Sequence, residues 1–425
     1  MSPIDISKSA DGRNRTRGVA ADELRRHNLS VVLERLHLSG PVSRSELTAG
    51  TGLNRSTIAY LIGGLVDLGL VDEGPSLTAA GPGRPSPMVK ARPEGATVLA
   101  IDLAVDSIAV ATLGLGGHVY DRLRVGRPRG RFSPQETVED VVKLAEPMLD
   151  SLPGNHILVG VGAAVAGVVR RSDGFVHLAP NLGWRNTPLA AMLAAKLELS
   201  GDVLVANDAD LGALAEHRRG VGRGVGHLIY ISGEVGIGIG VILDGKPLLG
   251  SAGYAGEAGH TLINPDGQKC RCGATGCWET EAGEAALIRH AGLSVDVTGL
   301  GALETVLARA TVGDASTIAA IHEVGRWLGL GAGNLINVFN PELVVLGGHY
   351  HRLFAFLQAA VVEAARTRTL DAPGDMATIA PSGLGSDAPL IGAAELAFSG
   401  VIADPAAAAG HSVRGGRATA KATRL

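Results

Sequence analysis

This 425-residue sequence contains only three cysteines, and no apolar run in it approaches the roughly 20 residues that span a bilayer. The first residues, MSPIDISKSADGRNRTRG, lack the apolar core of a secretory signal. An odd number of cysteines also leaves one thiol unpaired in any disulfide framework. We therefore expect a cytoplasmic protein that keeps its thiols reduced and has no membrane partner.

Neither sign of charge dominates the chain, whose net charge is -4, but the charge is unevenly distributed. Residues 1–92 contain 12 Lys and Arg against 9 Asp and Glu, whereas the remainder contains 26 against 33. A basic N-terminal part on an acidic remainder suggests that only the former meets a polyanion. The length, with 46% hydrophobic and 19% charged residues, is that of an ordinary globular protein of two or three domains.

All of the cysteine is concentrated in one segment together with a histidine: His260, Cys270, Cys272 and Cys277. One imidazole and three thiolates form a complete tetrahedral shell for a structural Zn²⁺. Gly273 and Gly276 allow a short loop to fold back, so that three sulfurs converge on one metal. A disulfide is the alternative, but Cys270 and Cys272 are too close in sequence to bridge easily. The spacing therefore predicts a zinc site.

Residues 25–92 have the pattern of a small helical domain that ends in a hairpin. A polar segment, residues 1–24, precedes it, and we expect that segment to be disordered. Apolar residues recur at helical spacing through residues 28–38, and Gly40-Pro41 ends this first helix.

Two further helices are marked by capping residues. Ser43, with Glu46 three residues later, forms a capping box that begins a second helix. After a turn at Gly52, Asn54 caps a third helix, over residues 55–69. The apolar residues of this helix share one face: Ile58, Leu61, Ile62, Leu65 and Leu68.

This order of elements is typical of a winged helix-turn-helix, whose third helix enters the major groove N-terminus first. Polar and basic side chains at the helix starts would reach base edges and phosphates: Ser43, Asn54, Arg55, Ser56, Thr57 and Tyr60. The Gly/Pro-rich residues 75–89 would form the wing, where Arg84 resembles the core of an AT-hook. A helical hairpin that merely supports the larger domain is the alternative, but the elements in this order favour binding of double-stranded DNA.

Residues 97–400 alternate between apolar strand segments and helical segments, after an expected linker at residues 91–96. This alternation occurs twice and predicts two related α/β halves around a cleft. Turns after the first strands of each half often hold phosphate, because backbone N–H groups gather there. The two candidates are residues 102–106 (DLAVD) and 232–240 (SGEVGIGIG).

Several short stretches of this region resemble the ROK family, a set of bacterial repressors, unassigned reading frames and sugar kinases. They are NLGW (181–184), NDAD (207–210), GYAGEAGH (253–260), CRCGATGCWE (270–279), NVFNPELVVLGG (337–348) and PLIGAAELA (389–397). The resemblance spans about residues 25–400, because the N-terminal region is similar to the repressor branch. It implies an α/β, actin-like, ribonuclease-H-type fold of two lobes.

The resemblance also implies that a hexose-like ligand lies in the cleft, bound by Asn207, Asp208, Glu257, His260 and Glu279. Carboxylates suit this task because their oxygens accept from neighbouring hydroxyls. His260 would serve both the metal and the sugar, one ring nitrogen to each. In the kinases of the family, the aspartate that matches Asp208 is the catalytic base. Taken singly, each acid has the alternative of a solvated or capping carboxylate.

The phosphate turns depart from the kinase pattern. Family kinases have Asp-x-Gly-Gly-Thr in the first turn, where this chain has Ala104, Val105 and Asp106 in place of Gly-Gly-Thr. In the second turn the chain has Glu234-Val235 where kinases have Gly-Thr. Side chains at 104 and 105 would crowd a phosphate, and the two acids would repel it. These changes argue against ATP binding.

We therefore expect a sugar-responsive DNA-binding regulator, a repressor of carbohydrate-metabolism genes without catalytic activity. Its partners would be a double-stranded DNA operator, a sugar or sugar-phosphate effector, and further copies of itself in a homodimer or homotetramer. The alternatives are a sugar kinase with a DNA-binding domain and an interaction protein without a ligand. Residues 404–425, Ala/Gly-rich and basic, are expected to form a disordered tail.

Overall fold

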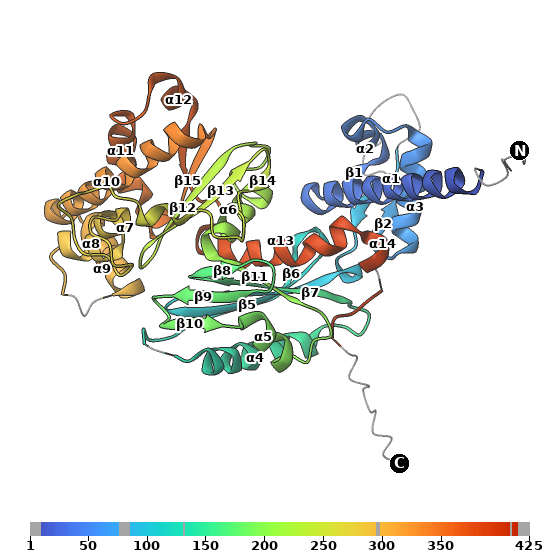
Figure 1. The fold of residues 1–425 in the computed structure, drawn as a ribbon, viewed down its shortest axis with the longest axis horizontal. Helices are drawn as coiled ribbons and strands as arrows, with labels where there is room; N and C mark the ends of the chain where they lie inside the picture. The colour runs from blue at the N-terminus through green and yellow to red at the C-terminus, as the bar shows by residue number, and fades with distance from the viewer. Residues whose placement is uncertain (1–9, 76–85, 131, 295–297, 409, 415–425) are drawn as a thin grey trace, which may run out of the picture.

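The computed structural model describes residues 10–75, 86–130, 132–294, 298–408 and 410–414, with side chains from residue 22 onward. Within these residues the chain forms an N-terminal domain and two α/β lobes (Figure 1). The prediction of an actin-like, two-lobed α/β fold with an N-terminal helix-turn-helix is confirmed.

The N-terminal domain contains three helices and a small antiparallel sheet: α1 (Ala10–Ser39), β1 (Val42–Ser43), α2 (Arg44–Thr51), α3 (Arg55–Asp67), β2 (Val71–Gly74) and β3 (Met88–Ala91). Both predicted caps are present. The Ser43 hydroxyl accepts from the N–H of Glu46 at 3.2 Å, and Asn54 Oδ1 accepts from the N–H of Thr57 at 2.8 Å. The predicted apolar face of α3 is buried. Capping and periodicity therefore sufficed to locate these helices.

The first helix is longer than the sequence pattern predicts. It begins at Ala10, so residues 10–24 are helical and the prediction of a disordered leader was wrong for them. The helix was predicted from apolar residues at helical spacing, and residues 10–27 lack this pattern. Ala, Glu, Leu and Arg are good helix formers and extend a helix that has already been nucleated by its buried turns.

The predicted linker at residues 91–96 is instead packed between the N-terminal domain and the first lobe. Pro93–Gly95 forms a 3₁₀ turn, η1, and Ala96 is fully buried. A Cβ at Gly95 would lie 2.1 Å from the carbonyl oxygen of Gly69, so the two backbones touch. The hydrophobic core of the N-terminal domain consequently continues into that of the first lobe.

The first lobe is built on a five-stranded sheet with the order β11-β7-β4-β5-β6. Its strands are β4 (Thr97–Leu103), β5 (Ser107–Gly114), β6 (His118–Gly126), β7 (Leu158–Val165) and β11 (Val203–Asn207). Helices α4 (Pro134–Ser151) and α5 (Leu189–Lys196) cover one face, and α13 (Ala388–Ala403) covers the other. A small sheet adjoins it: β8 (Val168–Arg170), β9 (Phe175–Ala179) and β10 (Trp184–Thr187).

The second lobe repeats this plan with a sheet of order β14-β13-β12-β15-β16. Its strands are β12 (Leu228–Gly233), β13 (Ile237–Leu243), β14 (Lys246–Pro247), β15 (Leu343–Gly348) and β16 (Thr378–Pro381). One face packs against α6 (Asp208–Arg219) and the other against a helical layer. That layer contains α7 (Trp278–Ala282), α8 (Glu284–His290), α9 (Gly299–Thr311), α10 (Ala315–Phe339) and α11 (His349–Arg366), with α12 (Asp371–Met376) beside α10.

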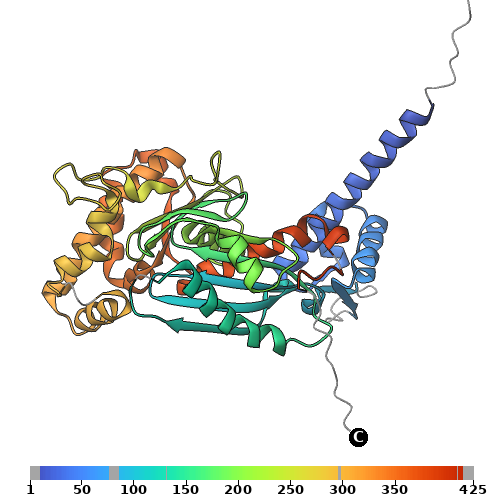
Figure 2. The same cartoon turned by 60° about the horizontal axis from the view of Figure 1, so that its bottom comes forward.

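Helices α6 and α13 meet between the two sheets, one from each lobe (Figure 1). At Gly392 of α13 a Cβ would come within 2.0 Å of the carbonyl oxygen of Leu211 in α6, so the close contact requires glycine. The N-terminal domain lies at the end of α13, as Figure 2 shows from a second side. The two lobes and the N-terminal domain are thus joined around these two helices.

The C-terminal segment is ordered further than predicted. Pro405–Ala408 form the short helix α14, and the carbonyl oxygen of Val413 accepts from Ser200 N–H at 2.7 Å. The predicted disordered tail therefore does not include these residues, because backbone pairing with the first lobe holds them; residues 415–425 lie outside the described part. Gly385–Ala403 has the length and composition of a membrane span, but most of this segment is buried between the lobes.

Candidate functional site

The four residues of the predicted metal site come together in the second lobe. Their ligand atoms all lie within 4.8 Å of one another. The distance from Cys270 Sγ to His260 Nδ1 is 3.6 Å, and that from Cys272 Sγ to Cys277 Sγ is also 3.6 Å. Zn–S bonds of about 2.3 Å give tetrahedral edges of about 3.8 Å. The cluster therefore has the size and the donor atoms of a four-coordinate metal site.

The backbone of the metal loop explains how these ligands converge. Gly273 and Gly276 have φ of +102° and +75°, and a Cβ at Gly276 would lie 1.8 Å from the carbonyl oxygen of Asn264. Only glycine permits both turns, as predicted. All three cysteines are free, which removes the disulfide alternative. The loop then leads directly into α7.

His260 stands between this cluster and the cleft. It ends the 3₁₀ turn η3 (Glu257–His260), which places Glu257 on the same side. Its Nδ1 faces Cys270, while its Nε2 lies 3.9 Å from a carboxylate oxygen of Glu257. Glu279 Oε1 lies 3.5 Å from His260 Nδ1 and accepts from the Cys270 thiol at 2.9 Å. The predicted division of the ring, one nitrogen for the metal and one for a ligand, fits this geometry.

The other predicted ligand residues lie at the start of α6. Asn207 caps this helix, because its Oδ1 accepts from the N–H groups of Ala209 and Asp210 at 2.8 and 3.3 Å. Its Nδ2 donates to the carbonyl oxygen of Gly167 at 3.1 Å. Asn207 therefore holds the helix in place, with one Nδ2 hydrogen left for a ligand. Asp208 Oδ1 turns back on the N–H of Ala209 at 3.0 Å.

Carboxyl groups gather around Asp208 from both lobes. Burial, with the charges of Asp102 and Glu257 nearby, raises the pKa of Asp208 to about 6. Burial likewise raises the pKa of Asp210 to about 7, against the opposing charge of Arg171. The carboxyl groups of this set offer hydrogen-bond acceptors for the hydroxyls of a sugar.

An ion-pair bridge of three residues lies beside the first turn and borders a cavity of about 350 Å³. Arg129, which follows β6, lies 3.4 Å from Asp106 of the first turn and 2.5 Å from Glu284 of α8. Glu284 also accepts from the N–H of Gly299 at 2.5 Å. Asp106 is thus neutralised by Arg129, and the predicted repulsion of phosphate by a free Asp106 was wrong. The bridge joins the two lobes where a nucleotide would enter.

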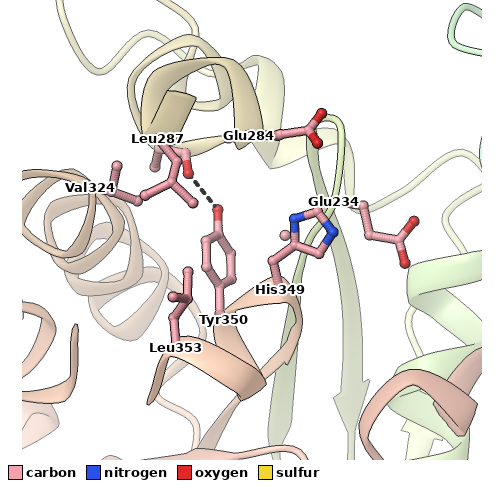
Figure 3. A pocket seen from close by; sticks show the side chains of 10 residues that line it. Glu234, Glu284, Leu287, Val324, His349, Tyr350 and Leu353 are labelled. Carbon is pink, nitrogen blue, oxygen red and sulfur yellow. Dashed lines mark hydrogen bonds between the residues drawn. The ribbon is translucent and has the colours of Figure 1, made fainter. Parts of the chain in front are cut away.

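In the second phosphate turn, Glu234 lies near His349 and Tyr350 (Figure 3). Burial, with the charges of Asp208 and Asp102, raises the pKa of Glu234 to about 8, so its carboxyl group is mostly neutral at pH 7. Beside it, Tyr350 donates to the carbonyl oxygen of Ala282 at 2.9 Å. The remaining cavity is about 10 Å³, about the room for one water. Burial of the Glu234 carboxyl group therefore weakens the repulsion of phosphate that was predicted for it.

The predicted DNA-contacting residues divide into capping and exposed groups. Ser43 and Asn54 are engaged as helix caps, and the Ser56 hydroxyl donates to Asn54 at 2.7 Å. Arg55 and Tyr60 are exposed on α3, and Tyr60 retains 63% of its accessible surface. Thr57 is half-buried, and Arg84 lies outside the described residues. The wing strands β2 and β3 pair as an antiparallel hairpin, which confirms that part of the prediction.

Several charged residues near the cleft were not predicted from the sequence. Arg124 of β6 donates to Asp102 at 3.1 Å, and Arg129 forms the bridge described above. Asp210 of α6 lies near Asp208, and Arg171, which directly follows β8, lies near Asp210. Asp210 belongs to the NDAD motif, so its position next to Asp208 was a usable signal. No sequence signal identified the arginines, because each contacts a partner that is distant in the sequence and is brought close only by the fold.

A winged helix-turn-helix joined to a two-lobed, actin-like sugar-kinase fold with a Cys₃His cluster defines the class of protein. The chain belongs to the ROK family, whose model matches residues 98–399. The resemblance inferred from the sequence motifs is thereby confirmed.

The relatives of this chain include repressors and glucokinases. The chain is 30% identical to the xylose repressor of Bacillus subtilis over 86% of its own length and 93% of that protein. It is 31% identical to the glucokinase of Streptomyces coelicolor, over 59% of its length and 81% of the glucokinase. A match over 86% is longer than residues 98–425, so the repressor also aligns with part of the N-terminal domain.

Solved structures give the same division. The chain is similar to a ROK family transcriptional regulator described as a homologue of the E. coli Mlc protein, with a TM-score of 0.72, 26% identity and coverage of 88% of this chain and 95% of that one. A ROK family glucokinase from Streptomyces griseus, in complex with glucose and AMPPNP, gives a TM-score of 0.63 at 28% identity. That comparison covers 71% of this chain and 99% of the glucokinase.

Proposed function

We propose that this protein is a sugar-responsive DNA-binding transcriptional repressor. The observation that carries the proposal is the winged helix-turn-helix packed directly on a sugar-kinase fold, an arrangement that the repressor relatives align with and the glucokinases do not span. Arg55 and Tyr60 on the exposed side of α3 supply the DNA-facing groups. An operator with two-fold symmetry is bound by at least a homodimer, so we extend the proposal to a homodimer or homotetramer. We also propose that the protein acts in the cytoplasm.

The effector is proposed to be a sugar held between Asp208, Glu257, His260 and Glu279, with Asn207 fixing the start of α6. The carboxylates and the imidazole of these residues, with Asp210 and Arg171 nearby, can form hydrogen bonds with the several hydroxyl groups of a sugar ring. The names of the relatives make D-xylose and D-glucose the first sugars to test.

The Cys₃His cluster is proposed to hold a structural Zn²⁺. Bound zinc would supply a fixed tetrahedral anchor with no open position, so it would orient residues and perform no catalysis. His260 would bind it through Nδ1, which leaves Nε2 directed to the cleft. The metal loop would then hold His260 and Glu279 in the positions from which they contact the sugar.

The kinase alternative is disfavoured by the nucleotide end of the cleft. Phosphoryl transfer needs room for the β- and γ-phosphates and Mg²⁺ between the two turns. Here Arg129 pairs with Asp106 of the first turn and with Glu284, and Glu234 stands in the second turn where the kinases have glycine. Asp208 is therefore proposed to bind a sugar hydroxyl without abstracting its proton.

Addition of the correct sugar is expected to raise the melting temperature of the purified full-length protein, because a ligand that binds only the folded state stabilises it by mass action. A panel that contains D-xylose, D-glucose and their phosphates, measured by thermal shift, tests this. Asp208→Asn should abolish most of the shift, whereas Asp140→Asn, on the exposed surface of α4, should leave it unchanged. No shift with any sugar would favour an interaction protein without a ligand.

The same preparation distinguishes a sensor from a kinase. A coupled assay with Mg-ATP and the bound sugar should show no turnover, and calorimetry should detect no Mg-ATP binding. Robust phosphorylation that disappears in Asp208→Asn would establish the kinase alternative and overturn this part of the proposal.

Arg55→Ala is expected to weaken operator binding by about 1–3 kcal/mol if Arg55 contacts a base. The guanidinium is exposed at the first turn of α3, so its loss should leave the fold intact. Fluorescence anisotropy with an operator duplex selected from random sequences by the wild-type protein measures the change. Arg326→Ala on α10, far from this domain, is the matched control. Unchanged affinity of the Arg55 variant would show that another surface reads the DNA.

A further inference from the structure

The N-terminal domain and both lobes meet at one buried cluster of charged residues, which we call the junction cluster: Glu34, His37, Arg218, Arg219 and Glu395. Glu34 and His37 belong to α1 of the N-terminal domain. The two arginines end α6, which packs on the sheet of the second lobe. Glu395 belongs to α13, which packs on the sheet of the first lobe. No other ionic cluster in the described residues joins all three parts.

Glu395 is the centre of the junction cluster and is 2% exposed. Its carboxylate accepts from Arg219 Nε at 2.7 Å and from Arg218 Nη1 at 3.3 Å. His37, fully buried, lies 3.2 Å from both Glu395 oxygens through Nε2. His37 Nδ1 accepts from the N–H of Gly116 at 2.9 Å, and Arg219 Nη2 lies 2.6 Å from His37 Nε2. The groups that contact Glu395 therefore come from α6 of the second lobe and from α1 of the N-terminal domain.

The contact between α6 and the N-terminal domain is direct. Arg218 Nη2 donates to Glu34 of α1 at 3.0 Å, and nearby Arg223 Nη2 donates to the carbonyl oxygen of Leu38 at 3.2 Å. By contrast, the ion pair of Arg26 with Asp404 links α1 to the end of α13 and not to α6. Besides the pairing of His37 with Glu395, α1 therefore makes two further ion pairs in the described residues, one with each lobe.

Helix α6 connects the junction cluster to the effector site. Its first residue is Asp208 and its last is Arg219, so its 12 residues span about 17 Å at 1.5 Å per residue. A Cβ at Gly212 would lie 2.4 Å from the ring of Tyr230 in β12, so α6 packs closely on the sheet of its own lobe. A displacement of the second lobe that carries α6 with it moves both ends of the helix.

We propose that α6 transmits occupancy of the cleft to the DNA-binding domain, through the junction of Arg218 and Arg219 with Glu34, His37 and Glu395. The inference rests on the proposed function and adds the path by which sugar binding affects the DNA-binding domain. When a sugar draws the lobes together, α6 moves with the second lobe and α13 with the first. The arginines then shift relative to Glu395 and pull on α1 through Glu34, which changes the placement of α3. Sugar and DNA are coupled because each favours one arrangement of the junction cluster.

The first test compares the two ion pairs of α1 in full-length protein. The operator duplex is titrated with and without saturating D-xylose or D-glucose, whichever raises the melting temperature, and the ratio of the two DNA dissociation constants is measured. Glu34→Ala and Arg218→Ala should each reduce this ratio at least threefold, and the double variant should reduce it no further. Arg26→Ala should keep the ratio within twofold of the wild-type value.

Equal ratios in the wild type and both Glu34 and Arg218 variants would overturn the inference while leaving the proposed function intact.

A second test needs DNA only. Operator binding should alter the deuterium uptake of peptides that cover residues 207–214 in the wild type, and this change should be lost in Arg218→Ala. An unaltered uptake in the wild type would overturn the inference even if neither sugar binds. Failure to select any duplex would overturn the proposed function and the inference together.

Discussion

Glu395→Ala is expected to lower the free energy of unfolding by about 3–5 kcal/mol, a large fraction of the stability of an ordinary domain. The variant leaves the Arg219 guanidinium and the fully buried His37 ring without the carboxylate that they contact. Removing one member of a buried ionic cluster costs more than the cluster contributes, because the remaining charge stays buried. Urea denaturation followed by circular dichroism measures this loss.

The control for this variant is Glu304→Ala, which breaks an exposed pair with Arg352 and should cost less than about 1 kcal/mol. The pH dependence gives a second check. Burial alone would raise the pKa of Glu395, but the hydrogen bond and charge of His37, with Arg219 and Arg218, hold it at about 2, below the usual 4.5. Its contribution is therefore complete above about pH 5 and is lost as the pH falls toward 2. Equal stability of the two variants would show that the cluster is not a structural centre.

Cys272→Ser is expected to remove the metal, so that bound zinc falls from one per chain to near zero after dialysis against a chelator. Cys272 is exposed, so the substitution changes the ligand set with little loss of packing. Sugar affinity should fall about tenfold, because His260 and Glu279 lose their fixed positions and one or two hydrogen bonds of about 1 kcal/mol each are weakened. Elemental analysis and sugar calorimetry on the same samples give both quantities.

Arg271→Ala is the matched control for the metal, since it lies in the same loop and donates to Asn181 at 2.7 Å without belonging to the cluster. It should retain a full complement of zinc. A wild-type protein that carries no zinc after growth in zinc-replete medium would refute the metal proposal. Full sugar affinity in a zinc-free Cys272→Ser variant would instead show that the loop is ordered without its metal.

Local patterns in the sequence predicted correctly the helix caps and the four residues that form the Cys₃His cluster. The capping box of Ser43, the cap at Asn54 and the turns at Gly273 and Gly276 each depend on residues a few positions apart. Interactions over such short separations are nearly independent of the remaining fold.

The interpretation of the phosphate turns was right about the residues but wrong about their charges. Asp106 and Glu234 were expected to repel phosphate. In the structure Asp106 is paired with Arg129, and burial leaves Glu234 mostly protonated. The charge of a side chain depends on its burial and its neighbours, which come from β6 and α8, far away in the sequence.

The sequence by itself determined most of the elements, their caps, the four residues of the Cys₃His cluster and the family, because these depend on residue type and on short spacing. Tertiary structure alone decided that α1 docks on α6 and α13 through Glu395, that Arg129 pairs with Asp106 and Glu284, and that residues 91–96 are packed. Those features bring together residues up to 358 positions apart, as His37 and Glu395 show. Their energies come from burial and from pairing across the fold, and neither is encoded in any local pattern.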